Sequence, residues 1–425
     1  MSRVTLESLG CKLNQAEMEA LADRLVSRGH LLTASAGEAD VYVLNTCSVT
    51  HIADRKSRQA LRSARRANPQ ARVIATGCYA RRMPEELSRL GVVDVILGDA
   101  EADGVVDAIE GHGDAGSTVL TSDSAGNRGR TRSLVKIQEG CRDFCSFCVV
   151  PYARGPGRSR TVDEILPEVS DKVSRGHQEV VLTGTKLGDY RSNGHGSAGL
   201  PELIRRILAE TKVERLRLSS LQPADLTPEL LALWHDSRLC PHLHLPLQSG
   251  SEAILRQMHR SYTLAEYETA VCQARDAIPD LSITTDILVG FPGEGEGKFE
   301  ESYRFCERMG FAGMHVFPYS KRPGTSAATM PGQIDDKIKK HRSSRMMALS
   351  KRSARQFRSR FLGRTMMVLW EDKSSDGLWS GHAANYLQVC AVTNDELAGK
   401  MLPVRIVGEY ADGLRGEIVN GGYDG

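Results

Sequence analysis

The chain lacks any apolar run long enough to cross a bilayer, and its first residues, Met-Ser-Arg-Val-Thr-Leu-Glu, lack the apolar core of a secretory signal. We therefore expect a cytoplasmic protein with no membrane partner. Its ten cysteines, in the absence of a secretory signal, are expected to be reduced thiols rather than disulfides. The length of 425 residues allows two to four domains.

A strong net charge is also absent, because the formal charge is only +2. The distribution is uneven, however. Residues 337–364 contain eleven Lys or Arg and no acid, whereas residues 365–425 contain four basic and nine acidic residues, a formal charge of −5. A cationic stripe inside a nearly neutral chain is typical of a surface that meets a polyanion.

The most informative cysteines are Cys141, Cys145 and Cys148. A closed zinc site needs a fourth nearby Cys or His, but the next cysteine is Cys240 and residues 152–160 contain no His. A bacterial ferredoxin would have the spacing Cys-x2-Cys-x2-Cys. The spacing Cys-x3-Cys-x2-Cys instead favours a [4Fe–4S] cluster with one open iron, the arrangement that radical S-adenosylmethionine (SAM) enzymes use.

Three other cysteines, Cys11, Cys47 and Cys78, each follow a short apolar run that is typical of a strand. Helical patterns lie between these runs, at residues 14–28 and 54–66. Alternating strands and helices predict a parallel sheet, whose ligand site lies at the carboxyl ends of its strands. A single such cysteine is usually a small buried hydrophobe, but three at the same offset predict a second [4Fe–4S] cluster.

With two cysteine triads, the sequence resembles the radical SAM methylthiotransferases nearly from end to end. The resemblance rests on the order and spacing of motifs that are individually weak. These are Leu-Gly-Cys-Lys-Leu-Asn-Gln at 9–15, Asn-Thr-Cys-Ser-Val-Thr at 45–50, Thr-Gly-Cys-Tyr-Ala at 76–80, Cys-Val-Val-Pro-Tyr-Ala-Arg-Gly at 148–155, His-Leu-Pro-Leu-Gln-Ser-Gly-Ser at 244–251, Thr-Asp-Ile-Leu-Val-Gly-Phe-Pro-Gly-Glu at 285–294 and Phe-Pro-Tyr-Ser-Lys-Arg-Pro-Gly-Thr at 317–325.

The resemblance implies an α/β fold in three parts. A parallel α/β domain at 1–110 would hold the auxiliary cluster, and a partial TIM-like barrel at 131–362 would end in a basic helix. A small β-barrel of the RNA-binding TRAM type would occupy 363–425, where Gly-His-Ala-Ala-Asn-Tyr-Leu at 381–387 is similar to its usual motif. The Gly- and Ser-rich residues 111–130 are predicted to be a linker.

For the cofactors, the resemblance implies two [4Fe–4S] clusters and SAM. We expect Cys141, Cys145 and Cys148 to bind the catalytic cluster and Cys11, Cys47 and Cys78 the auxiliary one. Six further residues are candidate SAM contacts: Phe147, Gly184, His244, Gln248, Leu288 and Gly290. The alternative for His244 and Gln248, expected on one strand, is a polar pair satisfied in the core. Glu294, after a Pro-Gly turn, is expected to cap the next helix rather than to act in catalysis.

The basic residues 337–364 are predicted to form a helix that contacts RNA phosphates through Arg345, Arg352, Arg355 and Arg358. The alternative is an ordinary solvated face. The acidic residues that follow would repel phosphate, so we expect the helix to supply most of the affinity. A second basic face, at residues 55–66, is a further candidate for gripping the anticodon arm of a tRNA.

Small differences in the motifs predict the substrate. The Cys-Lys-Leu-Asn-Gln run at 11–15 resembles enzymes acting on N6-threonylcarbamoyladenosine at position 37 of tRNA, and we expect Lys12, Asn14 and Gln15 to suit its polar substituent. The alternatives are isopentenyl-adenosine in tRNA and an aspartate of a ribosomal protein. The chemistry also implies a sulfur donor and a reductant such as flavodoxin or ferredoxin. A non-catalytic iron–sulfur RNA-binding protein or redox sensor is a further alternative.

Overall fold

The computed structural model describes residues 1–98, 102–111, 131–192 and 198–419. By contacts within the chain these form two compact units. Unit 1 comprises the described residues of Met1–Arg128 together with Glu139–Gly157 and Ser320–Ala328, and unit 2 comprises the rest. The predicted linker lies outside the described residues apart from Gly111. Among the helices described, none is both long and apolar enough to cross a membrane.

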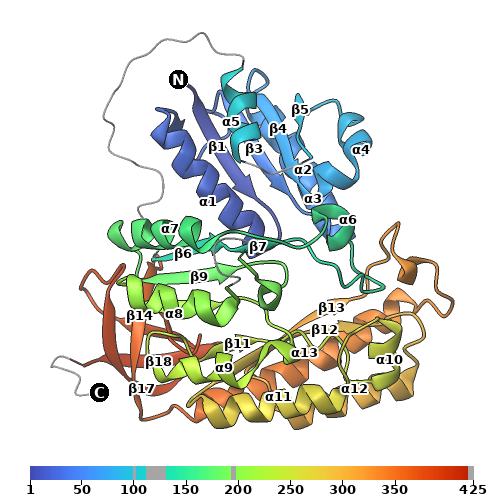
Figure 1. Cartoon of the computed structure of the whole chain (residues 1–425), viewed down its shortest axis with the longest axis vertical. Helices are drawn as coiled ribbons and strands as arrows, with labels where there is room; N and C mark the ends of the chain where they lie inside the picture. Colours follow the sequence, from blue (N-terminus) through green and yellow to red (C-terminus); the bar gives the residue numbers. More distant parts are fainter. Residues whose placement is uncertain (99–101, 112–130, 193–197, 420–425) are drawn as a thin grey trace. The chain divides into compact units, whose positions relative to one another are not determined.

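Unit 1 is built on a five-stranded parallel sheet in the order β2-β1-β3-β4-β5 (Figure 1). The predicted strands are confirmed, because each β-branched run forms one of the three central strands. The strands are β1 (Arg3–Ser8), β2 (Leu31–Leu32), β3 (Val41–Thr46), β4 (Arg72–Gly77) and β5 (Val95–Ile96). All six residues of β3 are buried, as expected for a central strand with both faces covered.

Helices cover both faces of this sheet. One apolar cluster joins β1 and β3 to α1 and α5, and a second joins β3 and β4 to α2, α3 and α4. The helices are α1 (Lys12–Ser27), α2 (His51–Ala67), α3 (Cys78–Arg82), α4 (Pro84–Ser88), α5 (Ala102–Glu110) and, after the second cysteine triad, α6 (Val150–Arg154); the 3-10 turn η4 spans Ser326–Ala328. This arrangement leaves the carboxyl ends of the strands open as a site.

Unit 2 contains six parallel strands in two three-stranded sheets, β10-β9-β6 and β11-β12-β13. Parallel bridges from Leu216 to Leu239 and from Ser220 to His244 join the sheets, so the strands form a partial barrel. The strands are β6 (Arg132–Lys136), β9 (Glu179–Thr183), β10 (Arg215–Leu218), β11 (His242–His244), β12 (Ser282–Val289) and β13 (Gly313–Pro318). The predicted TIM-like architecture is confirmed.

Helices lie on the outer side of these strands and share one continuous apolar core with them (Figure 1). Along β12 the residues alternate, with Thr285, Ile287 and Val289 buried against the helices and the residues between them half-buried. The α-helices are α7 (Val162–Ser174), α8 (Leu200–Glu210), α9 (Pro228–Leu231), α10 (Glu252–Gln257), α11 (Leu264–Ala277), α12 (Glu296–Met309) and α13 (Asp336–Ser359). Shorter elements are β7 (Gln138–Glu139), β8 (Arg158–Ser159) and the 3-10 turns η1 (Leu187–Asp189), η2 (Pro223–Asp225) and η3 (Ala232–His235).

The end of unit 2 is a closed five-stranded barrel, in agreement with the predicted small β-barrel. Its strands are β14 (Thr365–Lys373), β15 (Leu378–Ala383), β16 (Gln388–Val392), β17 (Met401–Tyr410) and β18 (Gly413–Ile418). Arg215 of β10 donates hydrogen bonds to the carbonyls of Met367 and His382, at 2.6 and 2.9 Å. The small barrel therefore packs on the amino-terminal end of the parallel strands and leaves their carboxyl ends to the site.

Candidate active site

Both cysteine triads belong to unit 1, because the segment Glu139–Gly157 groups by contacts with the N-terminal residues. The segment was expected in the barrel domain, so this division by contact differs from a division in chain order. Cys11, Cys47 and Cys78 follow β1, β3 and β4, which are neighbours in the sheet. The predicted convergence of these cysteines on one sheet edge is therefore what the topology produces.

The turn before Cys11 requires glycine. Gly10 has a φ of +99°, and a Cβ atom at this position would lie 2.6 Å from Sγ of Cys47. Only glycine adopts this backbone conformation without strain while leaving the neighbouring thiol its space. The strand-to-helix turn thus brings the first ligand loop directly against the second.

Burial keeps two of the three auxiliary thiols protonated while they are free. Cys47 and Cys78 are buried, whereas Cys11 is exposed. Burial raises the pKa of Cys47 to about 12, and the nearby Cys78 and Cys11 add to the rise. Burial also raises the pKa of Cys78, although the Arg154 guanidinium opposes it. Cluster binding must therefore displace protons from these thiols, as thiolate ligation of metals generally does.

A buried arginine connects the two triads. Arg154, at the end of α6, donates to Oε1 of Glu17 at 2.7 Å and to Oδ1 of Asn14 at 2.6 Å. Glu17 also accepts from the side-chain amide of Asn45, which lies two residues before Cys47. All these groups are buried. The loop after the second triad is thus held to the helix that begins next to Cys11.

This network corrects the expectation for Asn14. Its amide nitrogen donates to the carbonyls of Leu9 and Thr46, and its oxygen accepts from Arg154. The side chain of Asn14 is only 1% exposed, and its amide group is already engaged in these hydrogen bonds, so it does not contact a substrate. Gln15 is exposed and Lys12 half-buried, so the local motif mixes one structural residue with two accessible ones.

The second triad lies in a loop whose backbone N–H groups point at sulfur. The amide of Asp143 lies 3.5 Å from Sγ of Cys141, and the amide of Val150 lies 3.5 Å from Sγ of Cys148. Hydrogen bonds to the ligand sulfurs are one way in which proteins set the potential of an iron–sulfur cluster. Phe147, between the last two cysteines, is half-buried.

Each triad offers three thiolates, the number that a four-iron cluster with one open iron takes from the protein. A different group of potential metal ligands, in the described part of the chain, is His244, Asp286 and His315, whose ligand atoms all lie within 4.8 Å of one another.

The candidate cofactor residues of unit 2 lie toward the carboxyl ends of its strands. Gly184 directly follows β9, and a Cβ atom there would lie 3.0 Å from Oε1 of Gln138. Leu288 is half-buried on β12, and Gly290 follows that strand with a φ of +73°. Gln248 was expected on one strand with His244, but β11 ends at His244. Gln248 instead has a φ of +68° and forms a separate parallel bridge with Ile287.

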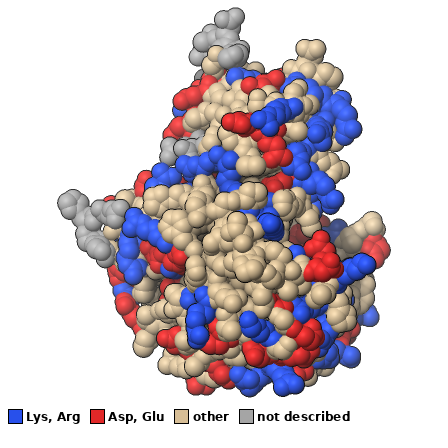
Figure 2. All heavy atoms as spheres, turned by 90° about the vertical axis from the view of Figure 1, so that its right-hand side faces the viewer, with Lys and Arg blue, Asp and Glu red and all other residues tan. Residues whose placement is uncertain are grey.

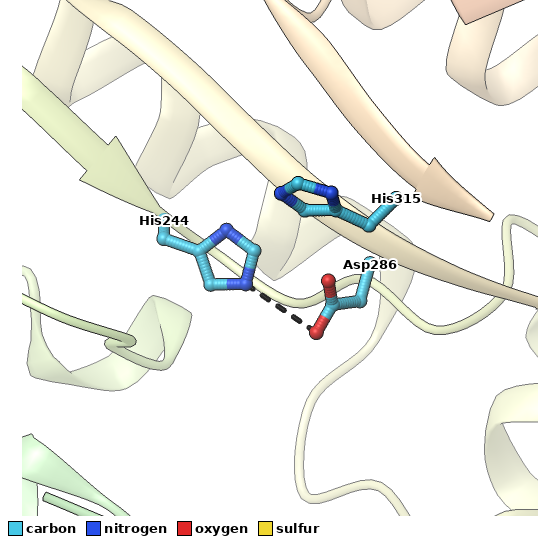
Figure 3. Close-up of side chains that lie close together, drawn as sticks. All are labelled: His244, Asp286 and His315. Carbon is cyan, nitrogen blue, oxygen red and sulfur yellow. Dashed lines mark ion pairs between the residues drawn. The ribbon is translucent and has the colours of Figure 1, made fainter. Parts of the chain in front are cut away.

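His244 is part of the compact group shown in Figure 3. Its Nε2 lies 3.3 Å from a carboxylate oxygen of Asp286, and its Nδ1 lies 3.0 Å from the hydroxyl of Thr284. His315 lies on β13, beyond the central strand β12 that carries Asp286, and its ring centre is 5.7 Å from that of His244. The side chain of His244 is thus held at both ring nitrogens, on rigid strands, at the end of β11.

Glu294 does not cap the next helix, contrary to the expectation. α12 begins at Glu296 with Gly295 as its N-cap, and no side chain caps it. The Glu294 carboxylate accepts from the backbone of Gly290 at 2.5 Å and from Arg342 of α13 at 3.0 Å. Burial raises the pKa of Glu294 to about 7, although both hydrogen bonds oppose the rise. It therefore braces the Gly290 turn against α13.

The predicted basic helix is present as α13, but acidic residues neutralise much of its charge. Arg345 forms ion pairs with Glu296 and Glu300, Arg352 with Glu307, and Arg355 with Glu409. The Nε of Arg358 is buried, with no hydrogen-bond partner among the described residues. The acids come from α12 and β17, which are distant in the sequence from α13.

Comparisons with known proteins agree with this site. Residues 3–98 match the model of the uncharacterized protein family UPF0004, and residues 135–306 match that of the radical SAM superfamily. Among solved structures, the radical SAM methyltransferase TsrM from Kitasatospora setae superposes with a TM-score of 0.58 at 15% identity, covering 77% of this chain and 75% of TsrM. That likeness shows the fold.

Curated relatives cover nearly the whole chain. The threonylcarbamoyladenosine tRNA methylthiotransferase MtaB of Bacillus subtilis is 34% identical over 96% of this chain and 94% of its own length, and MtaB of Aquifex aeolicus is 38% identical over 86% and 92%. The tRNA-2-methylthio-N(6)-dimethylallyladenosine synthase of Thermodesulfovibrio yellowstonii is 31% identical over 98% and 99%. With its two cysteine triads and its parallel-strand barrel, this chain belongs to the radical SAM methylthiotransferase family.

Proposed function

We propose that this protein converts N6-threonylcarbamoyladenosine at position 37 of tRNA to its 2-methylthio derivative. The supporting observation is the identity to relatives of each type. Those named threonylcarbamoyladenosine tRNA methylthiotransferases match at 34–38%, whereas those named dimethylallyladenosine synthases match at 30–32% over similar lengths. The cytoplasm, where tRNA is modified, is the proposed compartment.

The family's cofactors are SAM and two [4Fe–4S] clusters; when bound, they would supply the 5′-deoxyadenosyl radical that removes hydrogen from an otherwise inert C–H bond and the methylthio group that takes the place of that hydrogen. Cys141, Cys145 and Cys148 are the proposed ligands of the catalytic cluster. Cys11, Cys47 and Cys78 are the proposed ligands of the auxiliary one. The reaction also needs a sulfur donor and a reductant, for which flavodoxin or ferredoxin is the proposed class.

The barrel residues have proposed roles in holding SAM. The half-buried Asp286 carboxylate is proposed to accept hydrogen bonds from the hydroxyl groups of a ribose, and His244, which pairs with one of its oxygens, is proposed to line the same contact. Gly184, Leu288 and Gly290 would let the backbone approach the methionine and adenine parts, since two of them carry no side chain. Phe147 and Gln248 are proposed as further contacts with the cofactor.

The test is mass spectrometry of tRNA nucleosides from cells with and without the gene. Loss of 2-methylthio-N6-threonylcarbamoyladenosine, with its unthiolated precursor retained, is the expected result. Complementation with a Cys11→Ala variant should fail to restore the product, whereas Cys272→Ala, an exposed cysteine outside both triads, should restore it. Loss of the isopentenyl-type methylthio nucleoside instead would assign the other tRNA substrate.

A further inference from the structure

The solvent face of α2 in unit 1 is a continuous cationic stripe. The exposed residues of this helix recur at spacings of three and four, which places them on one side. Along that side lie Ile52, Arg55, Lys56, Gln59, Arg62, Ser63 and Arg66. Arg55 and Arg66 are eleven residues apart, so the four cations extend over about 16 Å at 1.5 Å per residue.

These four cations have no carboxylate partner in the part of the chain that the structure describes. No ion pair joins Arg55, Lys56 or Arg62 to an acid there, and Arg66 contacts only the hydroxyl of Ser63, at 3.5 Å. In the space-filling view, Lys and Arg gather along one edge of unit 1 (Figure 2). Unpaired, solvated cations in a row are available to phosphates.

The same helix carries two arginines of a different kind. Arg58 donates to the hydroxyl of Tyr79 and to Glu86, at 2.6 and 2.8 Å. Arg65 donates to the carbonyls of Pro69 and Ala71, at 2.9 and 2.8 Å, and pairs with Asp94. These two arginines hold α2 against the rest of unit 1. The helix therefore has one side whose arginines bind within the protein and an opposite, solvent-exposed side, the free face, whose cations are unpaired among the described residues.

The free face begins beside the auxiliary cysteines. α2 starts four residues after Cys47, and the hydroxyl of Ser57 donates to the Cys47 carbonyl at 3.3 Å. Val49 and Ile52, at this end, are large apolar side chains about half exposed. A nucleic acid bound along the helix would therefore have phosphates on the cations and an unpaired base toward the cysteines, where base-modifying chemistry requires it.

We infer that this face of α2, formed by Arg55, Lys56, Arg62 and Arg66, is the main phosphate-binding surface for the tRNA substrate. The inference rests on the proposed function and adds the surface that holds the substrate. On the basic helix α13, Arg345, Arg352 and Arg355 already pair with acids, so a phosphate must displace those carboxylates. Helix α13 also carries three exposed lysines without an ion pair among the described residues, Lys337, Lys340 and Lys351. The α2 face differs in that all four of its cations are unpaired there and its stripe begins beside the auxiliary cysteines, so a phosphate on it displaces only water and counterions.

The test compares three variants of the cluster-loaded, full-length protein. The first changes the α2 face, as Arg55→Gln, Lys56→Gln, Arg62→Gln and Arg66→Gln. The second removes four charges from α13, as Arg345→Gln, Arg352→Gln, Arg355→Gln and Arg358→Gln. The third, Arg58→Gln with Arg65→Gln, is the matched control on α2. Thermal unfolding and iron content establish that each is folded, and the single variants Lys56→Gln and Arg62→Gln provide a milder series.

The measurement is the affinity for tRNA, purified from cells lacking the gene, as a function of salt. Loss of four phosphate contacts should reduce the slope of log K against log salt by about 3 and weaken binding at least tenfold, because each contact contributes about 0.7 to 0.9 to the slope. Each single variant should reduce the slope by somewhat less than one. The α13 variant should change the slope less, and the Arg58/Arg65 control should leave it unchanged.

Two failures are distinguishable. Salt-dependent binding by the unaltered protein, together with an unchanged slope for the α2 variant, would overturn the inference and leave the function in place. A larger loss in the α13 variant would likewise overturn it and move the surface to that helix. No tRNA binding by the unaltered protein, with the 2-methylthio nucleoside intact in cells lacking the gene, would overturn the proposed function itself.

Discussion

At the scale of single residues, Arg154 shows how one side chain joins two distant parts of the sequence. Its guanidinium lies 137 residues in sequence from Glu17 and forms a buried pair with it. Such a pair costs free energy to desolvate, so its presence is weak evidence for stability on its own. Removing only one partner has a much larger effect, because the other charge is left buried and alone.

Replacing Arg154 by Met should therefore destabilise the packing of α1 by about 3–5 kcal/mol. Hydrogen exchange of the α1 amides measures this, since all three tryptophans lie in unit 2 and do not report on unit 1. The double variant Arg154→Met with Glu17→Met should recover part of the loss, because it removes the uncompensated carboxylate. Equal protection of α1 in the single variant and the unaltered protein would contradict this role.

Glu294 should make the stability of unit 2 depend on pH. Its pKa in the folded protein is about 7, above the ordinary value of 4.5, because the carboxyl is buried. Between these values the folded state binds more protons than the unfolded state, so stability falls as pH rises from 4.5 to 7. The size of the effect is about 3 kcal/mol, at 1.36 kcal/mol for each unit of pKa.

Unfolding in urea followed by tryptophan fluorescence at several pH values checks this prediction. Glu294→Gln keeps an acceptor oxygen for Gly290 and Arg342 but cannot ionise. The stability of this variant should therefore not show the part of the fall between pH 4.5 and 7 that comes from Glu294. The comparison with Glu296→Gln, an exposed partner of the same arginine, separates burial from ion pairing. Parallel curves for the unaltered protein and Glu294→Gln would show that the carboxyl is ionised throughout.

At the scale of elements, the strand-to-helix turns decide where the auxiliary ligands lie. Each turn follows a parallel strand and delivers a cysteine to the same edge, and α1 and α3 begin at or next to a cysteine. Two of these turns need glycine: a Cβ atom at Gly10 would lie 2.6 Å from Sγ of Cys47, and one at Gly77, before Cys78, would lie 2.1 Å from Oδ1 of Asn45. The cluster site is therefore defined by the strand-to-helix turns together with the cysteines that they carry.

Gly10→Ala should disrupt the auxiliary cluster. The added Cβ would meet Sγ of Cys47 at 2.6 Å, and alanine also resists a φ of +99°. Anaerobically reconstituted protein should hold about eight irons from two four-iron cubes, and the variant should lose about half of them. Gly29→Ala, with a φ of +82° and no atom within 4 Å of the added Cβ, shares the strain but should keep its iron.

At the scale of the whole molecule, the small C-terminal barrel closes the amino-terminal end of the parallel strands in unit 2. Tyr386, in the motif predicted from the TRAM resemblance, stacks on His242 with ring centres 4.8 Å apart. The Arg217 guanidinium lies 4.7 Å from the same ring, and its own ion pair with Glu179 is fully buried. In this structure the motif serves as a wedge between the two barrels.

Tyr386→Ala should lower the stability of unit 2 by at most about 3 kcal/mol, the lower end of the range for buried aromatic side chains, because Tyr386 is half-buried. Chemical unfolding monitored by Trp370 and Trp379 in the small barrel reports it directly. Tyr410→Ala, at an exposed position of the same barrel, should have little effect. If the two substitutions lowered the stability equally, Tyr386 would not stabilise the contact between the small barrel and the parallel strands.

The sequence by itself determined the six cysteines and the β-strands that deliver three of them. It also determined the parallel α/β sheet of unit 1, and the resemblance of its motifs to a known family implied the parallel barrel. The sheet and its cysteines depend on local spacing: a β-branched run forms a strand wherever it pairs, and each cysteine's position at its end follows from the chain. Cys11, Cys47 and Cys78 could therefore be placed at one sheet edge without coordinates.

Only the tertiary structure decided which polar groups neutralise one another. Asn14, which its motif predicted to be a substrate contact, instead accepts a hydrogen bond from Arg154. The arginines Arg345 and Arg355 of α13 form ion pairs with acids of α12 and β17. Glu294 braces a turn instead of capping a helix. Apart from the contact of Glu294 with Gly290, these partners lie tens to more than a hundred residues apart in the chain. An arginine is free to bind RNA only if folding does not bring a distant carboxylate within 4 Å of it. Local sequence patterns do not contain this information.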